Sequence, residues 1–277
     1  MTKTALQEVT TIHSAARDAR ADRGGVRVML LQARNADDPA GMHEQACFAA
    51  RMGLHPDQVQ CVSIFERDLE TLELAEVDAL LVGGAGQYSV LDDLPAIQDF
   101  VRFLAFVATD PSTADLPMFA SCFGFQALVL GLGGSVIEDE AHAEVGSYPL
   151  HLKPGADQDP IFGDLPGDFM AQLGHKDRAT ALPPGVLDLA GSERCPYQAV
   201  RVVGRPQVAT QFHPELAASD NRSRFLRYMR EYGKLMGREA AQERLDSHVP
   251  SLEANALLER FTTSEVMKRY RSRGRAI

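Results

Sequence analysis

The stretch that decides the fold reads Pro117-Met118-Phe119-Ala120-Ser121-Cys122-Phe123-Gly124-Phe125-Gln126. The half before Cys122 is short, apolar and preceded by a proline, which is typical of a buried parallel strand. The half after it continues as a nearly all-apolar segment to Leu132, with glycines around its end, which predicts a buried helix. Cys122 is therefore expected in the sharp turn between strand and helix, where a side chain projects at the carboxyl end of a sheet.

A thiol in this turn would gain reactivity from the backbone around it. The helix N-terminus favours thiolate over thiol, and the free N–H groups of the first helical turn can hold an oxyanion. Gly124 would let the backbone approach a substrate closely. The alternative is a buried structural cysteine, because free cysteine is among the most buried residue types. A lone cysteine would favour that alternative, so the interpretation depends on a second motif.

The second motif is Val208-Ala209-Thr210-Gln211-Phe212-His213-Pro214-Glu215, an apolar strand that runs into a polar turn at Pro214. An ordinary thiol is only a few per cent thiolate at neutral pH, so a nearby base raises its reactivity. His213 is the candidate base, and Glu215 is the candidate partner that orients the imidazole. Alone, this motif is more often a surface turn. The two motifs together are much more specific.

The pair of motifs resembles the class I (triad-type) glutamine amidotransferase family, whose pattern is Gly-x-Cys-x-Gly-x-Gln followed much later by Gln-Phe-His-Pro-Glu. The chain departs from it at Ala120, where the family usually has glycine. The resemblance covers roughly residues 26–236 and is strongest to the GMP-synthetase-like glutaminase branch. It implies that Cys122 is the nucleophile, His213 the base and Glu215 its partner, in a stand-alone glutaminase domain.

The resemblance also implies an oxyanion hole. An apolar segment at residues 77–82 ends in Gly83-Gly84-Ala85-Gly86, where the family has Gly-Gly-Pro-x-Ser. By resemblance, the N–H groups of Gly84 and Phe123 hold the oxyanion, and Ala85 in place of proline is a departure that affects the loop.

Four further residues are expected near the substrate. By resemblance, Gln126 helps to seat glutamine, and Ser147 and Tyr148 lie near the glutamine site. His175, in Gly174-His175-Lys176-Asp177, is a candidate for the mouth of the pocket. For Ser147, Tyr148 and His175 a purely structural role is an equal alternative.

The remaining pattern predicts an α/β protein with an open, mostly parallel sheet of flavodoxin-like type. Three domains are expected: an N-terminal extension at 1–25, the amidotransferase domain at 26–236 and a helical C-terminal extension at 237–277. One long helix is predicted at 222–236. The apolar segments expected to form strands are residues 26–31, 59–65, 77–82, 134–138, 143–152, 186–190, 199–203 and 207–212. Four further helices are expected at residues 41–52, 95–106, 251–261 and 263–272, and the last two carry apolar faces that need a surface to pack on.

The net charge and the cysteine content indicate which partners, cofactors and cellular location to expect. The formal net charge is −10, which argues against a broad nucleic-acid surface, and the basic run at 268–275 is interpreted as a solvated terminus. The four cysteines are scattered without a metal-binding pattern, so neither a metal nor another cofactor is expected. Few cysteines, no signal peptide and no membrane-spanning run together predict a cytoplasmic protein.

The leading hypothesis is hydrolysis of the glutamine side-chain amide through a thioester on Cys122. The chain has no Ser-Gly-Gly-x-Asp-Ser ATP-pyrophosphatase motif, so a synthetase that uses the ammonia would be a separate chain. A stand-alone γ-glutamyl hydrolase with the same triad is the second hypothesis, and a non-catalytic pseudo-glutaminase is the third. The C-terminal helices would cover the domain, form a homodimer contact or dock a partner, and the sequence leaves these open.

Overall fold

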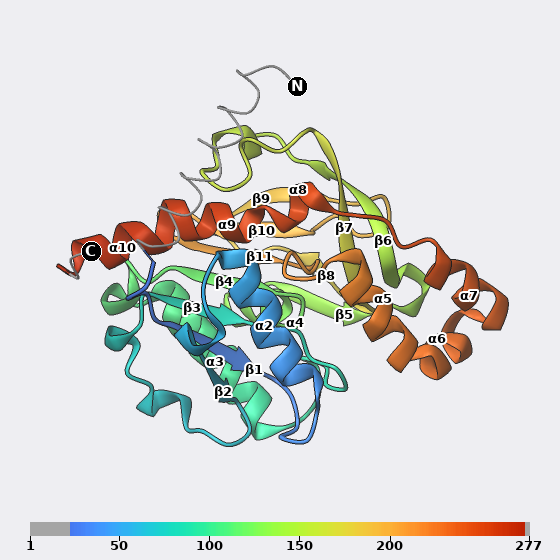
Figure 1. The fold of residues 1–277 in the computed structure, drawn as a ribbon, viewed down its shortest axis with the longest axis horizontal. Helices are drawn as coiled ribbons and strands as arrows, with labels where there is room; N and C mark the ends of the chain where they lie inside the picture. Colours follow the sequence, from blue (N-terminus) through green and yellow to red (C-terminus); the bar gives the residue numbers. More distant parts are fainter. Residues whose placement is uncertain (1–22, 275–277) are drawn as a thin grey trace, which may run out of the picture.

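The framework of the computed structural model, which describes residues 23–274, is a nine-stranded mixed sheet (Figure 1). Its order is β2-β1-β3-β4-β11-β10-β9-β6-β7. The first five strands are parallel and the last four are antiparallel, and β5 pairs with β8 in a separate small sheet. The strands are β1 Val28–Gln32, β2 Val59–Ser63, β3 Ala79–Val82, β4 Met118–Ser121, β5 Ser135–Glu138, β6 Glu144–Leu152, β7 Asp168–His175, β8 Asp177–Ala181, β9 Val186–Gly191, β10 Ala199–Val202 and β11 Gln207–Thr210. The predicted α/β fold is confirmed, with a larger antiparallel part than the sequence indicated.

Both faces of the parallel half are buried under helices. Along β1, Val28 and Leu30 contribute to one hydrophobic core, whereas Met29 and Leu31 contribute to the other, as the two-residue repeat of a strand requires. Helix α2 (Ala40–Met52) covers the first face, and α3 (Pro95–Thr109) and α4 (Phe123–Gly131) cover the second. The continuous apolar strands therefore reflect burial on two sides.

A helical rod near the C-terminus completes the face that α2 covers (Figure 1). It consists of α8 (Leu252–Asn255), α9 (Leu257–Phe261), a π-helical turn and α10 (Met267–Ser272). Phe261 is fully buried and meets the ring of Phe119 edge-on, with 5.5 Å between the ring centroids. The apolar faces that the sequence predicted for these helices thus pack into the main core. A domain boundary at residue 237 stays a prediction.

The basic residues of the last helix contact the body of the protein. Arg269 forms a 2.7 Å ion pair with Asp115, and Arg273 binds the carboxylate of Asp78 at 3.0 Å and the carbonyl of Val77 at 2.7 Å. The interpretation of this run as a solvated terminus is therefore wrong for these two arginines, because their partners lie on the edge of the folded domain.

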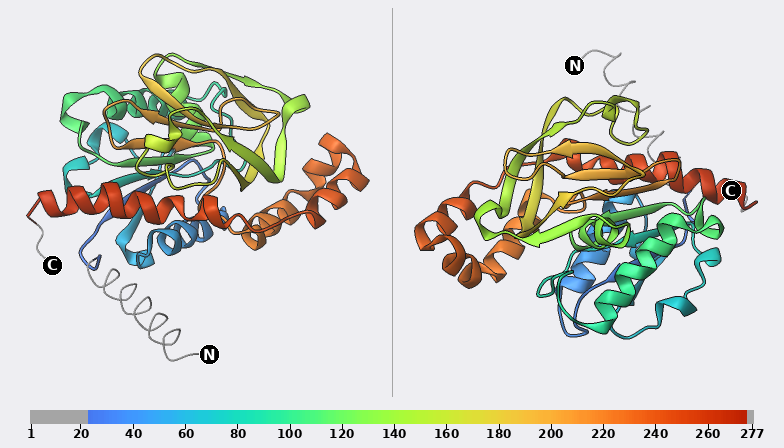
Figure 2. Two further views of the ribbon diagram at one scale, coloured as in Figure 1. Left: turned by 90° about the horizontal axis from the view of Figure 1, so that it is seen from above. Right: turned by 180° about the vertical axis from the view of Figure 1, so that it is seen from behind.

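Helices α5 (Ala218–Arg227), α6 (Met229–Met236) and α7 (Arg238–Asp246) project beside the antiparallel end of the sheet (Figure 2). The sequence predicted one helix at 222–236, but the structure divides it at Tyr228. Within residues 23–274, no helix is both long and apolar enough to span a bilayer.

Candidate active site

Cys122 occupies the turn between β4 and α4 that the sequence predicted. Its backbone has φ 51° and ψ −98°, and it is the sole non-glycine residue with positive φ in the part of the chain that the structure describes. Its N–H donates to the carbonyl of Thr210 on neighbouring β11 at 2.7 Å. Gly124 serves packing here, because a Cβ on it would lie 2.5 Å from the side chain of Val82. The turn is thus strained and held in place by the adjacent strand.

His213 and Glu215 follow β11 and form a buried pair. The imidazole Nδ1–H donates to Glu215 Oε1 at 2.7 Å, and the Glu215 side chain is fully buried. Burial alone would lower the pKa of His213, but the charges of Glu215 and then Cys122 outweigh burial and raise the pKa to about 10. Burial would likewise raise the pKa of Glu215, but the charge and hydrogen bond of His213 lower it. The arrangement favours the imidazolium–carboxylate pair.

Gly84 lies directly against this pair. A Cβ on Gly84 would be 2.8 Å from Cε1 of His213 and 3.8 Å from Cβ of Cys122. Its N–H, however, donates to Oε1 of the buried Glu44 at 3.2 Å. The predicted oxyanion-hole residue is therefore beside Cys122, while its N–H is bound to a carboxylate of the protein.

Glu44 is a functional candidate that the sequence analysis missed. It lies on α2 with no exposed surface, and its carboxylate accepts hydrogen bonds from Arg34 Nη2 at 3.0 Å and Gln32 Nε2 at 3.0 Å. Burial would lower the pKa of Arg34, but the charges and hydrogen bonds of Glu44 and Asp38 together outweigh burial and raise that pKa. No local pattern distinguishes Glu44 from the solvated acids of an amphipathic helix, because its partners come from β1 and from two loops.

A cavity of about 410 Å³ opens in front of Cys122. Phe123, Gln126 and His175, three of the predicted site residues, also line it. The sequence did not identify the aromatic side chains of the wall, which are Tyr88, Tyr228 and Tyr232. The last two come from the break between α5 and α6 and from α6 itself.

A chain of hydrogen bonds connects the cavity wall to Cys122. The Gln126 side-chain amide donates to the carbonyl of Asp177 at 2.8 Å and to Oε1 of Gln211 at 3.1 Å. Gln211 in turn donates to Sγ of Cys122 at 3.6 Å. Asp177 Oδ2 accepts from the Ser89 hydroxyl at 2.5 Å, whereas its buried Oδ1 has no hydrogen-bond partner. Burial raises the pKa of this carboxyl. A buried acceptor without a partner therefore belongs to a residue of the cavity wall.

His175 is held from both sides below the cavity. Its Nδ1–H donates to the carbonyl of Asp177 at 3.0 Å, and its Nε2 faces Glu144 Oε2 at 3.2 Å. Ser147 and Tyr148 do not line the cavity. The Ser147 hydroxyl donates to Gln172 Oε1 at 3.0 Å, and the Tyr148 ring lies under a guanidinium from α7. Cys122 and His175 therefore line the same cavity, whereas Ser147 and Tyr148 contact other parts of the chain.

Several known proteins resemble this chain in sequence. The family model described as glutamine amidotransferase class-I matches residues 50–229. The glutamine-hydrolyzing GMP synthase of Thermosipho africanus is 32% identical over 139 residues, which are 50% of this chain and 24% of that protein. A glutamine-hydrolyzing GMP synthase subunit from Methanocaldococcus jannaschii is 33% identical over 107 residues, which are 39% of this chain and 55% of that protein. The chain thus spans only about a quarter and about half of the lengths of these relatives.

Solved structures share the fold. The glutamine amidotransferase of Methylobacillus flagellatus superposes with a TM-score of 0.60 at 19% identity, covering 89% of this chain and 94% of the other. A glutamine amidotransferase of Thermotoga maritima gives a TM-score of 0.60 at 18% identity, covering 86% and 99%. With the family model matching well over half of its length, the chain belongs to the class I glutamine amidotransferase family.

Proposed function

We propose that the protein hydrolyses the side-chain amide of glutamine, with Cys122 as nucleophile, His213 as its proton-transfer partner and Glu215 as the group that orients His213. The observation that carries the proposal is the combination of a strained cysteine at a helix N-terminus with a buried His213–Glu215 bond of 2.7 Å beside it. Because Glu215 favours the imidazolium, His213 would stabilise the attacking thiolate and then give its proton to the departing ammonia.

The cavity supports an amino-acid substrate. Asp177 Oδ1, buried and without a partner, suits the α-ammonium group of glutamine, and Gln126 positions Asp177 through its backbone carbonyl. Phe123 N–H, in the first turn of α4, would hold the oxyanion. Gly84 would join it once its N–H leaves Glu44. Water would then release glutamate from the Cys122 thioester.

We further propose that the ammonia is used by a separate synthetase chain. The named relatives include one glutamine-hydrolysing GMP synthase and one subunit of such a synthase, and both are longer than the segment that matches. A second chain that supplies the acceptor is consistent with a domain that carries only the hydrolytic residues.

The test is glutamate release by the purified chain from L-glutamine and from a γ-glutamyl dipeptide, with Cys122→Ala as the inactive control. Cys122-dependent release from glutamine alone is expected, at a low rate while Gly84 N–H is bound to Glu44. Faster release from the dipeptide would replace the proposal with a γ-glutamyl hydrolase. If neither is cleaved, a diazoketone analogue of glutamine should still alkylate Cys122, and failure of that labelling would exclude a glutaminase.

A further inference from the structure

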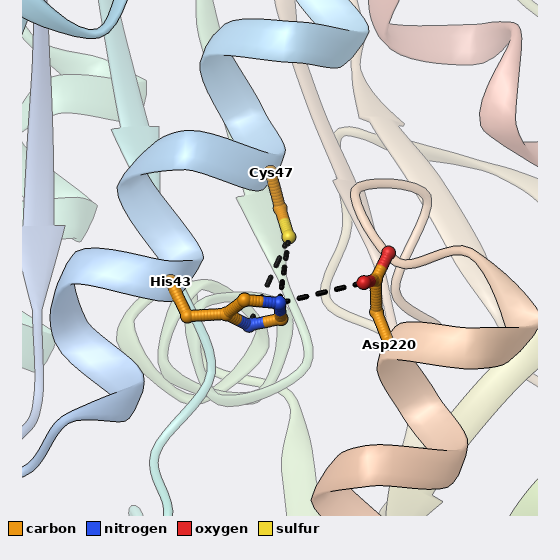
Figure 3. Close-up of side chains that lie close together, drawn as sticks. All are labelled: His43, Cys47 and Asp220. Carbon is orange, nitrogen blue, oxygen red and sulfur yellow. Dashed lines mark hydrogen bonds and ion pairs between the residues drawn. The ribbon is translucent and has the colours of Figure 1, made fainter.

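Three side chains with metal-binding atoms lie together outside the active site (Figure 3). His43 and Cys47 point from α2, and Asp220 points from α5 toward them. His43 Nε2 is 3.4 Å from Asp220 Oδ1 and 3.6 Å from Cys47 Sγ, and the three potential ligand atoms all lie within 4.8 Å of one another.

Local structure fixes each of these side chains. His43 and Cys47 are four residues apart on α2, so they occupy the same face one turn apart. Asp220 lies in the first turn of α5, where its Oδ2 accepts from the N–H of Ala217 at 2.9 Å. This capping bond orients the carboxylate and leaves Oδ1 directed at His43.

Two of the three spacings match the edges of a tetrahedral zinc site, and the third, between Cys47 Sγ and the Asp220 carboxylate, is within 4.8 Å. Zinc–sulfur bonds of about 2.3 Å and zinc–nitrogen or zinc–oxygen bonds of about 2.05 Å give edges of about 3.5 Å between S and N and about 3.3 Å between N and O. The corresponding distances here are 3.6 Å and 3.4 Å. A direct hydrogen bond between imidazolium and carboxylate would be shorter, at about 2.8 Å. The geometry therefore suits a shared ion better than a direct His43–Asp220 bond.

Burial and charge also suit a cation. Cys47 is 9% exposed, whereas the side chains of His43 and Asp220 are 41% and 30% exposed, so the open side faces solvent. The carboxylates of Asp220 and Glu215 lie near the Cys47 thiol. The same carboxylates favour a positive ion at the sulfur.

We propose that His43, Cys47 and Asp220 bind a divalent transition-metal ion of the zinc class, with a water molecule as the fourth ligand. Binding forms one bond from the ion to each of the three side chains and releases the thiol proton of Cys47 to solvent. The site is separate from the proposed catalytic groups, so it stands or falls independently of the glutaminase proposal.

The ion would join α2 to α5 behind the active site. His43 precedes Glu44, whose carboxylate binds the N–H of Gly84, and α5 carries Arg224, whose guanidinium is 3.9 Å from Glu215. The two helices therefore hold residues that contact Gly84 and Glu215, and an ion between them would fix the relative position of the helices.

A second cluster, which also contains a carboxylate, a histidine and a cysteine, has no side that faces solvent. Glu144, His175 and Cys195 are all buried, and Glu144 Oε2 faces His175 Nε2 at 3.2 Å and accepts from Gln198 Nε2 at 2.6 Å. A metal there would have to displace these bonds and would have no solvent-facing position, so the proposal concerns the α2–α5 cluster alone.

The experiment titrates Co²⁺ into the full chain carrying Cys122→Ala, which removes the catalytic thiol as a competing ligand. We expect a thiolate-to-cobalt charge-transfer band and the visible bands of tetrahedral cobalt, complete at one equivalent and abolished by added Zn²⁺. In the same background, Cys47→Ser should lose the charge-transfer band. His43→Asn should no longer bind one equivalent of Co²⁺ at this site. Asp220→Asn should weaken Zn²⁺ binding by at least about tenfold, since even the loss of a ligand's hydrogen-bond partner costs that much.

Matched controls come from residues of the same type elsewhere. Cys61→Ser on β2 and His55→Asn, both at exposed positions, should leave the spectrum unchanged. If the Cys47 variant does not fold, alkylation mapped by mass spectrometry on the Cys122→Ala chain replaces it, and Zn²⁺ should protect Cys47 while Cys61 stays reactive. The absence of a charge-transfer band, its persistence in Cys47→Ser, or equal alkylation of Cys47 with and without Zn²⁺ would overturn the proposal.

Discussion

Replacing Glu215 by glutamine should remove most of the pH dependence of stability above neutrality. Glu215 is fully buried, and its Oε1 accepts from His213 Nδ1–H at 2.7 Å. Glutamine keeps a hydrogen-bonding oxygen of similar size but lacks the charge. The largest cause of the raised pKa would then be gone, so the pKa of His213 should fall well below 10, while Cys122 would still raise it against the effect of burial.

The size of the His213 contribution to the free energy of unfolding follows from the linkage between protonation and folding. The pKa of His213 is raised in the folded state, so its contribution to stability is fully present below pH 6.5 and is lost as pH rises through 10. The full span from 6.5 to about 10 corresponds to about 5 kcal/mol at 1.36 kcal/mol for each pH unit, and Glu215 contributes the largest part of what raises the pKa, with Cys122 contributing the rest. Glu215 has a lowered pKa, so its own contribution is present above the unfolded value of 4.5 and is lost only in acid, outside this window.

Urea unfolding of the wild type and Glu215→Gln between pH 6.5 and 10 measures this contribution. The difference between the two proteins cancels the other groups that titrate in the same range, and it should shrink by several kcal/mol as pH rises. Glu265→Gln is the matched control, because Glu265 binds Arg201 at 3.1 Å. It should lower stability by a similar amount at every pH in this window. Parallel pH profiles for wild type and Glu215→Gln would refute the assignment of the raised pKa to Glu215.

Three further predictions concern stability, measured by urea unfolding at neutral pH. Phe261→Ala should cost about 3–5 kcal/mol, because it empties a fully buried site in the main core, and a loss below about 1 kcal/mol would mean that the C-terminal rod is peripheral. Glu44→Ala should cost about 3–5 kcal/mol by leaving the buried Arg34 guanidinium without this partner, whereas Glu138→Ala, which breaks an exposed pair, should cost less than about 1 kcal/mol. Cys122→Gly should be more stable than Cys122→Ala by about 1–3 kcal/mol, since glycine accepts the positive φ, and equal stabilities would contradict strain at the turn.

The parallel half of the sheet and the Cys122 turn were predictable, because they depend on short-range patterns. Apolar runs ending in glycine or polar residues identified β1, β3, β4 and β11, and the pairing of β4 with β11 brings the Cys122 turn and the His213 motif to the same edge. The sequence predicted the meeting of Cys122 and His213 through the two motifs and the family that they resemble, and not through the order of the strands.

Strand β7 was missed because its burial depends on distant partners. Gln172 is fully buried, and its side chain bonds to Ser147, Asn221 and Ser251, which are 25 to 79 residues away. From the neighbouring sequence alone, such a glutamine indicates a surface segment, because its distant partners are not apparent. The break at Tyr228 likewise has no glycine or proline to announce it, so the two tyrosines of the cavity wall could not be assigned to it.

The position of the C-terminal rod has a consequence for synthesis of the protein. The ribosome produces all eleven strands and α2 before residues 252–272, yet these residues cover Phe119 and complete the core around it. Arg23 and Glu259, which are 236 residues apart, meet only at this last step. The nascent chain therefore exposes an apolar face until residues 252–272 are synthesised. Such a face favours chaperone binding or aggregation. A product that stops before residue 252 would keep that face exposed, and quality-control proteases could distinguish it from the finished molecule by this surface.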